Sequence, residues 1–252
     1  MLINRRRLLG AVAVAPCGGL TSAVAGVARR DKIRAIAFDG FPIFDPRPIF
    51  ALAEALFPGR GAEFSNAWRT RQFEYTWLRT VVGRYRDFLG IIDDALIFAG
   101  NSLGLDMTEQ KRTALVNGYL NMKAWPDVVP ALSKLKEDGI RLALLSNFTP
   151  VMFDANIRSA DLGAFFEYKL STDAVQVFKP HPRTYQMAID AFGIDREEIL
   201  FAAFAGWDAS GAKLFGYPTF WINRQKQPLE LIDAIPDGEG TSMRDLVGFL
   251  SP

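Results

Sequence analysis

Five short β-rich runs, separated from one another by helical patterns, constrain the fold of this chain most strongly. They are RAIAFD (34–39), RLALLS (141–146), EYKLS (167–171), ILFAAF (199–204) and TFWIN (219–223). Largely apolar runs of this length are typical of strands in a parallel sheet that helices cover on both faces. Helical patterns at 126–139 and 182–193 end at Gly139 and Gly193, as helices commonly do. The sequence therefore predicts an α/β fold with a three-layer α/β/α core.

The stretch from residue 47 to residue 122 has a different pattern. It shows helical periodicity without strand-like runs, in IFALAEALF, FSNAWRTRQFEYTWLRTVV, FLGIIDDALIFAG and EQKRTALVNGYL. A purely helical block that follows the first strand is expected to form a cap over the sheet. We therefore predict a core domain of residues 32–46 and 123–252, with a helical cap domain of residues 47–122. The acidic segment 233–240, DAIPDGEG, is expected to be a solvated loop.

The first 30 residues have the features of an export signal. In NRRRLLG, Arg5 and Arg6 precede two leucines in a twin-arginine-like pattern, and a weakly apolar stretch leads to a small-residue site at 23–25. We predict a signal peptide over residues 1–25 and a periplasmic mature protein. An uncleaved anchor or a misplaced start codon, with a cytoplasmic protein, is the alternative.

The composition argues against two classes of partner. Cleavage after residue 25 would change the net charge from +1 to −2, because 26 basic and 28 acidic residues would remain. A charge near zero without a basic stripe gives no footprint for nucleic acid. No uninterrupted apolar run long enough to span a bilayer follows residue 30, so we expect no stable membrane association after cleavage.

The counts of cysteine and histidine exclude several catalytic chemistries. The one cysteine, Cys17, falls within the predicted signal, so the mature protein would have no disulfide and no thiol nucleophile. The one histidine, His181, excludes a histidine-rich zinc site, and no G-x-S-x-G elbow presents a serine. His181 precedes Pro182 at a predicted helix start, where we expect a capping or surface residue. Carboxylates and lysine remain as candidate catalytic groups.

Polar side chains follow the predicted strands at their carboxyl ends. Asp39 ends the first run, Ser146 and Asn147 follow the second, Lys179 follows the third and Asp208 the fourth. Each alone would be typical of a turn or a helix cap. Because ligands bind outside the carboxyl ends of parallel strands, we predict that these side chains meet in one crevice.

Several segments together resemble one known family. They are DGFPIFD (39–45), WRTRQFEYTWLR (68–79), DDALIFA (93–99), VFKPHPRTY (177–185) and GWDASGAKLFGYPTFWINR (206–224). On these motifs the chain resembles the haloacid dehalogenase (HAD) superfamily and, within it, the type II L-2-haloacid dehalogenases, over residues 32–250. The resemblance implies a HAD-like Rossmannoid core with a parallel sheet and an inserted helical cap.

The resemblance also implies roles for the strand-end groups. Asp39 matches the nucleophile of that family, and Lys179 matches the lysine that neutralises and orients it. Arg69, in the predicted cap, matches the residue that receives the halide. Ser146 and Asn147 match groups that hold the substrate carboxylate and the leaving atom.

The remaining matches surround the halogen. Phe88 and Trp207 match apolar walls, Asp208 matches a second acid, and Phe41 lies where the substrate binds. The implied reaction is hydrolytic dehalogenation of short 2-haloacids, from L-2-haloacid to D-2-hydroxyacid and halide, through an ester of Asp39. It implies a small-molecule substrate, no cofactor and no metal. Type II members commonly dimerise through their helices, so a homodimer formed around Trp77 is a further expectation.

The position of Phe41 favours this reaction over phosphate hydrolysis. A phosphatase of the superfamily uses an acid two residues after the nucleophile to protonate the leaving alcohol, and it binds magnesium. Phe41 occupies that position and can do neither, whereas halide leaves without a proton. A magnesium-dependent phosphatase and a vestigial or binding protein stay as alternatives.

The chain departs from the family pattern around the predicted nucleophile. The turn DGFPIFD is one residue shorter than usual, with Pro42 in place of glycine and Ile43 in place of threonine. Ala203 and Ala205 stand where the family has a serine and an asparagine. Each lost hydrogen bond is worth about 1 kcal/mol. These departures leave open how the ester of Asp39 is hydrolysed.

Overall fold

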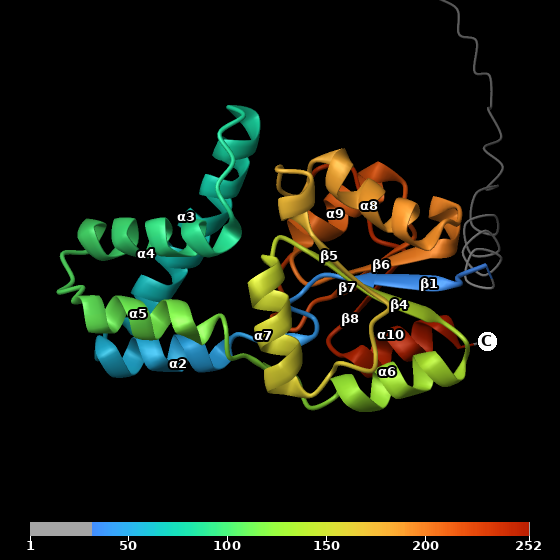
Figure 1. The fold of residues 1–252 in the computed structure, drawn as a ribbon, viewed down its shortest axis with the longest axis horizontal. Coiled ribbons are helices and arrows are strands. Elements are labelled where there is room, and N and C mark those ends of the chain that lie inside the picture. The colour runs from blue at the N-terminus through green and yellow to red at the C-terminus, as the bar shows by residue number, and fades with distance from the viewer. Residues whose placement is uncertain (1–31, 252) are drawn as a thin grey trace, which may run out of the picture.

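The structure is a computed structural model that describes residues 32–251 (Figure 1). The predicted signal peptide and Cys17 lie outside the described residues. Six strands form one sheet in the order β5-β4-β1-β6-β7-β8, and all neighbouring pairs are parallel. They are β1 (Ala35–Phe38), β4 (Arg141–Ser146), β5 (Tyr168–Ser171), β6 (Ile199–Ala203), β7 (Thr219–Ile222) and β8 (Gly238–Gly240). The predicted α/β fold with a parallel sheet is confirmed.

The edge strand β8 corrects one prediction. The acidic segment 233–240 was expected to be a loop throughout, but Gly238–Gly240 pairs with β7. The sequence did not indicate this strand, because the two glycines around Glu239 carry no strand-like pattern. The close packing explains the glycines: a Cβ on Gly238 would lie 2.6 Å from the ring of Phe249.

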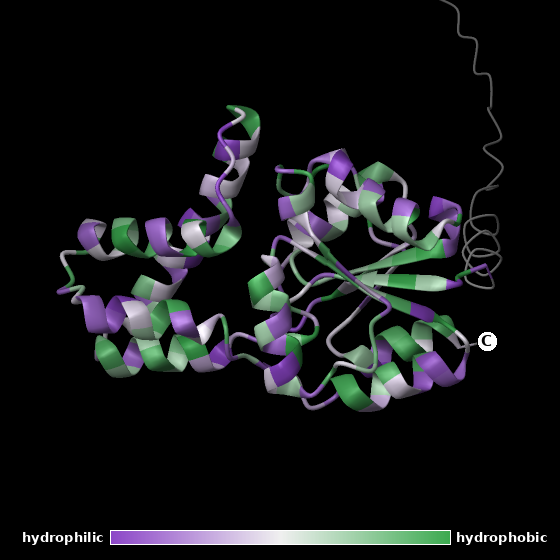
Figure 2. Ribbon diagram, in the orientation of Figure 1, coloured by the Kyte–Doolittle hydropathy of each residue, from purple (hydrophilic) through white to green (hydrophobic). Residues whose placement is uncertain are grey.

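Helices cover both faces of the sheet, as Figure 1 shows. The helices α8 (Pro182–Phe192) and α9 (Gly206–Phe215) lie on one face, and α6 (Val128–Glu137), α7 (Pro150–Ala160) and α10 (Met243–Leu250) lie on the other. Side chains of β1 alternate between the two layers: Ala35 and Ala37 pack toward one core cluster, Ile36 and Phe38 toward the other. Figure 2 shows the strands as a largely hydrophobic centre.

The helix that follows Lys179 begins as the sequence predicts. His181 is the N-cap of α8, and its Nδ1 accepts a hydrogen bond from the backbone N–H of Arg183. Pro182 is the first helical residue, where its missing N–H costs no hydrogen bond. Gly193 ends the helix with a φ of 66°, in the left-handed region that favours glycine.

Four helices lie between β2 (Phe44–Asp45) and β3 (Lys123–Ala124), the antiparallel pair through which the chain leaves the core and returns. They are α2 (Arg47–Leu56), α3 (Gly61–Val81), α4 (Phe88–Ser102) and α5 (Glu109–Gly118). Figure 1 shows them as a separate unit beside the carboxyl edge of the sheet. Trp68 is fully buried within this unit, and its Nε1 donates to the carbonyl of Ile92 over 2.8 Å. We call it the helical unit.

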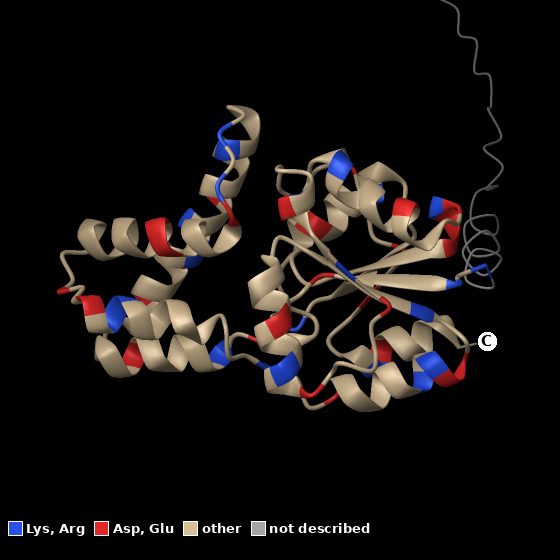
Figure 3. Ribbon diagram, in the orientation of Figure 1, with Lys and Arg blue, Asp and Glu red and all other residues tan. Residues whose placement is uncertain are grey.

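Charged side chains are distributed over both parts of the described chain. Figure 3 shows lysine and arginine interspersed with aspartate and glutamate. Among the described residues, no helix combines the length and the apolar character needed to cross a membrane.

Candidate active site

The carboxylate of Asp39 is fixed by three donors at the end of β1. Ser146 Oγ and Lys179 Nζ donate to its Oδ1 over 2.9 and 3.0 Å, and the backbone N–H of Phe41 donates to Oδ2 over 3.2 Å. The side chain of Asp39 is 12% exposed. Donors thus reach both carboxylate oxygens and fix the orientation of the side chain.

Lys179 lies between two carboxylates. Its Nζ is 3.0 Å from Asp39 Oδ1 and 3.0 Å from Asp208 Oδ2, and the residue is only 1% exposed. A buried ammonium is costly unless it is paired and hydrogen-bonded, and two carboxylates meet that need here. The backbone N–H of Lys179 donates to Asn147 Oδ1 over 3.2 Å, which holds the lysine against the end of β4.

Asp208 is buried in the first turn of α9. Its pKa is raised to about 6, mainly by burial; the charge of Lys179 lowers it, the charge of Asp39 raises it, and the hydrogen bonds from Tyr185 and Lys179 lower it. Tyr185 donates to Asp208 Oδ1 over 2.7 Å, and burial raises the pKa of Tyr185 well above its ordinary value. Asp208 therefore changes its charge within the range where enzymes operate, as a general base requires.

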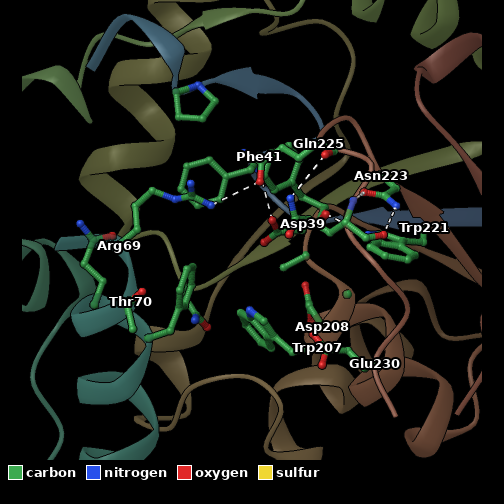
Figure 4. Close-up of a pocket in the computed structure, with 18 of the residues that line it drawn as sticks. Asp39, Phe41, Arg69, Thr70, Trp207, Asp208, Trp221, Asn223, Gln225 and Glu230 are labelled. Atoms are coloured by element: carbon green, nitrogen blue, oxygen red, sulfur yellow. Dashed lines mark hydrogen bonds between the residues drawn. The ribbon is translucent and has the colours of Figure 1, made fainter. Parts of the chain in front are cut away.

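A cavity of about 500 Å³ opens above Asp39 between the helical unit and the core. Arg69 reaches into it from α3, with its guanidinium 5.2 Å from the ring centre of Phe50 and Nη2 3.5 Å from Gln225 Oε1. Figure 4 shows the side chain of Arg69 extending from α3 toward Asp39 and Gln225, with Trp207 and Asp208 together. A cation on the helical unit thus shares the cavity with the carboxylate of the core.

Aromatic side chains form much of the cavity wall. Phe41, Phe88 and Trp207 all line it, as the sequence predicts for substrate contacts. Trp207 also packs against the helical unit, with ring centres 5.1 Å from Phe73 and 5.5 Å from Trp77. These walls exclude water from one side of a small ligand and strengthen electrostatic contacts inside the cavity.

The structure brings all nine sequence-predicted site residues to this cavity or its floor. Eight line the cavity, and Lys179 lies beneath it, hydrogen-bonded to three of them, Asp39, Asn147 and Asp208. The two alanines are also at the site: Ala203 is buried at the end of β6, and Ala205 lines the cavity wall as the N-cap of α9. Neither can supply a side-chain hydrogen bond to Asp39 or to a bound water.

Sequence reasoning missed three residues of the site. Tyr185 bonds Asp208, Gln225 bonds Arg69, and Trp125 Nε1 donates to the carbonyl of Phe41 over 2.9 Å. Tyr185 stands within the motif VFKPHPRTY, so its spacing from Lys179 was the available signal. Gln225 and Trp125 lie in segments without periodicity, where the sequence gives no indication of their partners.

The profile of the haloacid dehalogenase-like hydrolases matches residues 20–216, a range that includes β1 and the helix that carries Asp208. The chain therefore belongs to this family. Its fold and the placement of Asp39 at the end of the first strand agree with that assignment.

Two individual relatives are similar to this chain over most of its length. The (S)-2-haloacid dehalogenase of Pseudomonas sp. (strain YL) is 43% identical over 218 residues, which are 86% of this chain and 94% of that relative. Haloacetate dehalogenase H-2 of Moraxella sp. (strain B) is 38% identical over 82% of this chain and 92% of its own length.

Two solved structures share the architecture. One L-2-haloacid dehalogenase superposes with a TM-score of 0.85 at 40% identity, over 86% of this chain and 98% of that chain. The L-2-haloacid dehalogenase of Xanthobacter autotrophicus, solved with chloropropionic acid covalently bound, superposes with a TM-score of 0.80 at 30% identity over the same shares.

The environment of Asp208 leads to a prediction about its ionisation. Its carboxyl group should titrate near pH 6, neutral below and charged above, because burial outweighs the hydrogen bonds that favour the anion. Tyr185→Phe removes one of those bonds, so the midpoint should move upward. Carbon NMR of isotope-labelled aspartate side chains measures both midpoints, and Asp208→Asn identifies the signal. An unchanged or lower midpoint in Tyr185→Phe would contradict this account of the site.

Proposed function

We propose that this chain is a hydrolytic (S)-2-haloacid dehalogenase, which converts L-2-haloacids to D-2-hydroxyacids and halide. The observation that carries the proposal is the Asp39 carboxylate, held by Lys179 and Ser146 at the floor of a cavity that Arg69 enters from the helical unit. The relatives named (S)-2-haloacid dehalogenase and the structure with covalently bound chloropropionic acid support the same reaction.

In the first step, an oxygen of Asp39 attacks the carbon that carries the halogen, and the carbon–halogen bond breaks with inversion. Three donors fix the carboxylate, so the attack starts from an oriented nucleophile and loses little entropy. The product is an ester of Asp39 and a free halide ion.

Arg69 receives the departing halide. Its guanidinium stays protonated at any working pH, so it can stabilise the anion without exchanging a proton. Phe41, Phe88 and Trp207 give the halogen an apolar environment on the cavity wall. At the end of β4, the side-chain amide of Asn147 supplies a donor for the substrate carboxylate, while the hydroxyl of Ser146 holds Asp39.

In the second step, water adds to the carboxyl carbon of the Asp39 ester, and the bond from that carbon to the ester oxygen breaks. Negative charge develops on the Asp39 oxygen that remains the carbonyl. If that oxygen is Oδ1, the ammonium of Lys179 and the hydroxyl of Ser146 are its donors, and if it is Oδ2, the N–H of Phe41 is. Asp208, with a pKa of about 6, is ionised at neutral pH and accepts one proton of the water. It returns that proton to the departing alkoxide, which becomes the product hydroxyl, and the other proton of the water is released to solvent as the Asp39 carboxylate reforms.

This mechanism predicts the origin of the hydroxyl oxygen. In a single turnover with L-2-chloropropionate in heavy-oxygen water, the first product should be unlabelled and Asp39 should gain the label. Asp39→Asn should lose the covalent adduct and halide release. Mass spectrometry of the product and of the intact protein measures both.

Matched reactions separate this mechanism from its alternatives. D-2-chloropropionate should give no comparable release, and a chelator should leave turnover unchanged. Label in the first product would contradict the ester mechanism. Loss of turnover on chelation, restored by magnesium, would favour the phosphatase alternative.

We also propose that the chain forms a homodimer through the end of α3. Leu78, Val81 and Val82 are 58%, 85% and 60% exposed, and their spacing places them on one side of the helix. Figure 1 shows that this end of α3 projects beyond the rest of the helical unit. A second copy of the chain offers the same apolar surface, so a two-fold interface would cover both.

The homodimer predicts twice the mass of one chain in solution. Leu78→Glu with Val81→Glu should give a monomer, because two buried carboxylates per chain are costly in an apolar interface. Leu214→Glu, an equally simple change at a 64% exposed leucine of α9, serves as the control and should stay dimeric. Light scattering measures the mass. A monomeric wild type would contradict this proposal and leave the dehalogenase reaction untouched.

We further propose that residues 1–25 direct export to the periplasm, supported by Arg5 and Arg6 and by the small-residue site at 23–25. Arg5→Lys with Arg6→Lys should retain the protein in the cytoplasm, whereas the same change at Arg29 and Arg30 should not. Cell fractionation and the mass of the mature N-terminus measure the outcome. A wild-type protein that stays cytoplasmic with residues 1–25 intact would contradict export.

A further inference from the structure

The shortened turn after Asp39 is held by its carbonyl groups. Three consecutive carbonyls each accept a hydrogen bond from outside the turn: Phe41 O from Trp125 Nε1 over 2.9 Å, Pro42 O from Arg224 Nη2 over 3.2 Å, and Ile43 O from the backbone N–H of Trp125 over 3.1 Å. Two residues, Trp125 and Arg224, thus fix a turn in which Pro42 has no N–H to donate.

The ring of Trp125 is itself in contact with two guanidinium groups. The central carbons of Arg47 and Arg224 each lie 4.4 Å from the centre of the ring. Each arginine is oriented by a carboxylate: Arg47 by Asp45, and Arg224 by both oxygens of Asp127 at 3.0 and 2.8 Å. A cation over an aromatic ring is stabilising, and here two cations contact the same ring.

The position of Trp125 connects this stack to the fold. It follows β3, where the chain returns from the helical unit, and Arg47 begins α2, where the chain enters that unit. Arg224 follows β7. Trp125 and the two arginines therefore connect three segments to the turn after Asp39. These are the segment that enters the helical unit, the segment that returns from it, and the segment that follows β7.

We propose that Trp125 is a positioning residue for the nucleophile: its indole N–H fixes the carbonyl of Phe41, so that the N–H of Phe41 stays on Asp39 Oδ2. The N–H and the carbonyl of Phe41 belong to neighbouring peptide groups joined at its Cα, so a carbonyl fixed by Trp125 restricts how far the adjoining N–H can move from Asp39. This inference deepens the proposed function, because it takes Asp39 as the nucleophile.

The hydrogen bonds from Trp125 and Arg224 also take the place of the polar side chains that this turn lacks. Ile43 is fully buried and has no hydroxyl with which to hold the turn or Asp39. A buried carbonyl without a partner costs more than a hydrogen bond gains, so the donors from Trp125 and Arg224 are needed to keep the turn in one conformation.

Trp125→Phe tests this role, because it keeps an aromatic ring beside the two arginines and removes only the N–H donor. Formation of the Asp39 adduct with L-2-chloropropionate should slow about tenfold, with KM within about twofold of wild type; a factor of ten corresponds to about 1.4 kcal/mol, the scale of one buried hydrogen bond. Rapid-quench halide release and intact mass measure the rate.

Trp68→Phe is the matched control. It removes an indole N–H donated to a backbone carbonyl over 2.8 Å within the helical unit, so it carries a comparable cost in stability. It should lower the melting temperature similarly and leave adduct formation near the wild-type rate. If both variants slow the reaction equally, or if Trp125→Phe reacts at the wild-type rate, the positioning role is wrong.

A measurement without substrate keeps this inference separate from the proposed function. Isotope labelling of glycine carbonyl carbons and phenylalanine amide nitrogens selects the two Gly–Phe peptide groups of the chain, Gly40–Phe41 and Gly248–Phe249. In Trp125→Phe, the amide proton of Phe41 should shift upfield as its bond to Asp39 lengthens, with Phe249 as the internal reference. An unmoved Phe41 signal would overturn the inference. A moved signal in a protein that releases no halide would overturn the dehalogenase reaction alone.

Discussion

The contact on which the site depends is the buried ammonium of Lys179 between Asp39 and Asp208. Without it, two carboxylates would face one another in a nearly dry site, and at least one would hold a proton. With it, one ammonium lies between the two carboxylates, and the pKa of Asp208 is about 6. In the proposed reaction, the lysine therefore allows two neighbouring buried acids to have different roles, Asp39 as the nucleophile and Asp208 as the base.

The sheet positions these three groups because their segments end at the same edge. Strand β1 lies between β4 and β6, so Asp39 meets Ser146 on one side and the turn into α9, which carries Asp208, on the other. Lys179 reaches the same point from the segment after β5. A change of register in β1 by one residue would turn Asp39 to the other face of the sheet and separate it from Lys179.

The sequence predicted this convergence because parallel strands end together and each end carried a polar residue. The placement of Asp39 and Lys179 at the ends of the predicted strands follows from that rule. The sequence could not predict β8, whose glycines lack a strand pattern. Nor could it predict the contact of Arg69 with Gln225 or that of Trp125 with Phe41. Those contacts join segments far apart in the chain, and they depend on how the helical unit sits on the core.

The departures from the family pattern make physical sense together. Ile43, Ala203 and Ala205 remove hydroxyl and amide groups around Asp39, so the remaining donors there are Lys179, Ser146 and the backbone of Phe41. The position of a backbone N–H depends on the conformation of its turn, and this turn is short and contains a proline. The contacts that hold Phe41, Pro42 and Ile43 therefore matter more than they would in a turn with its own polar side chains.

The charges of the cavity explain how an anionic substrate can approach an anionic nucleophile. A 2-haloacid brings its own carboxylate, which Asp39 repels strongly in a site with little water. In the proposed reaction, Arg69 on the helical unit offsets that repulsion on binding and faces a second anion once the halide has formed. Because the helical unit carries Arg69 and the core carries Asp39, the full balance of charge exists only where the two parts meet. The inserted helices are thus a required half of the site as well as its cover.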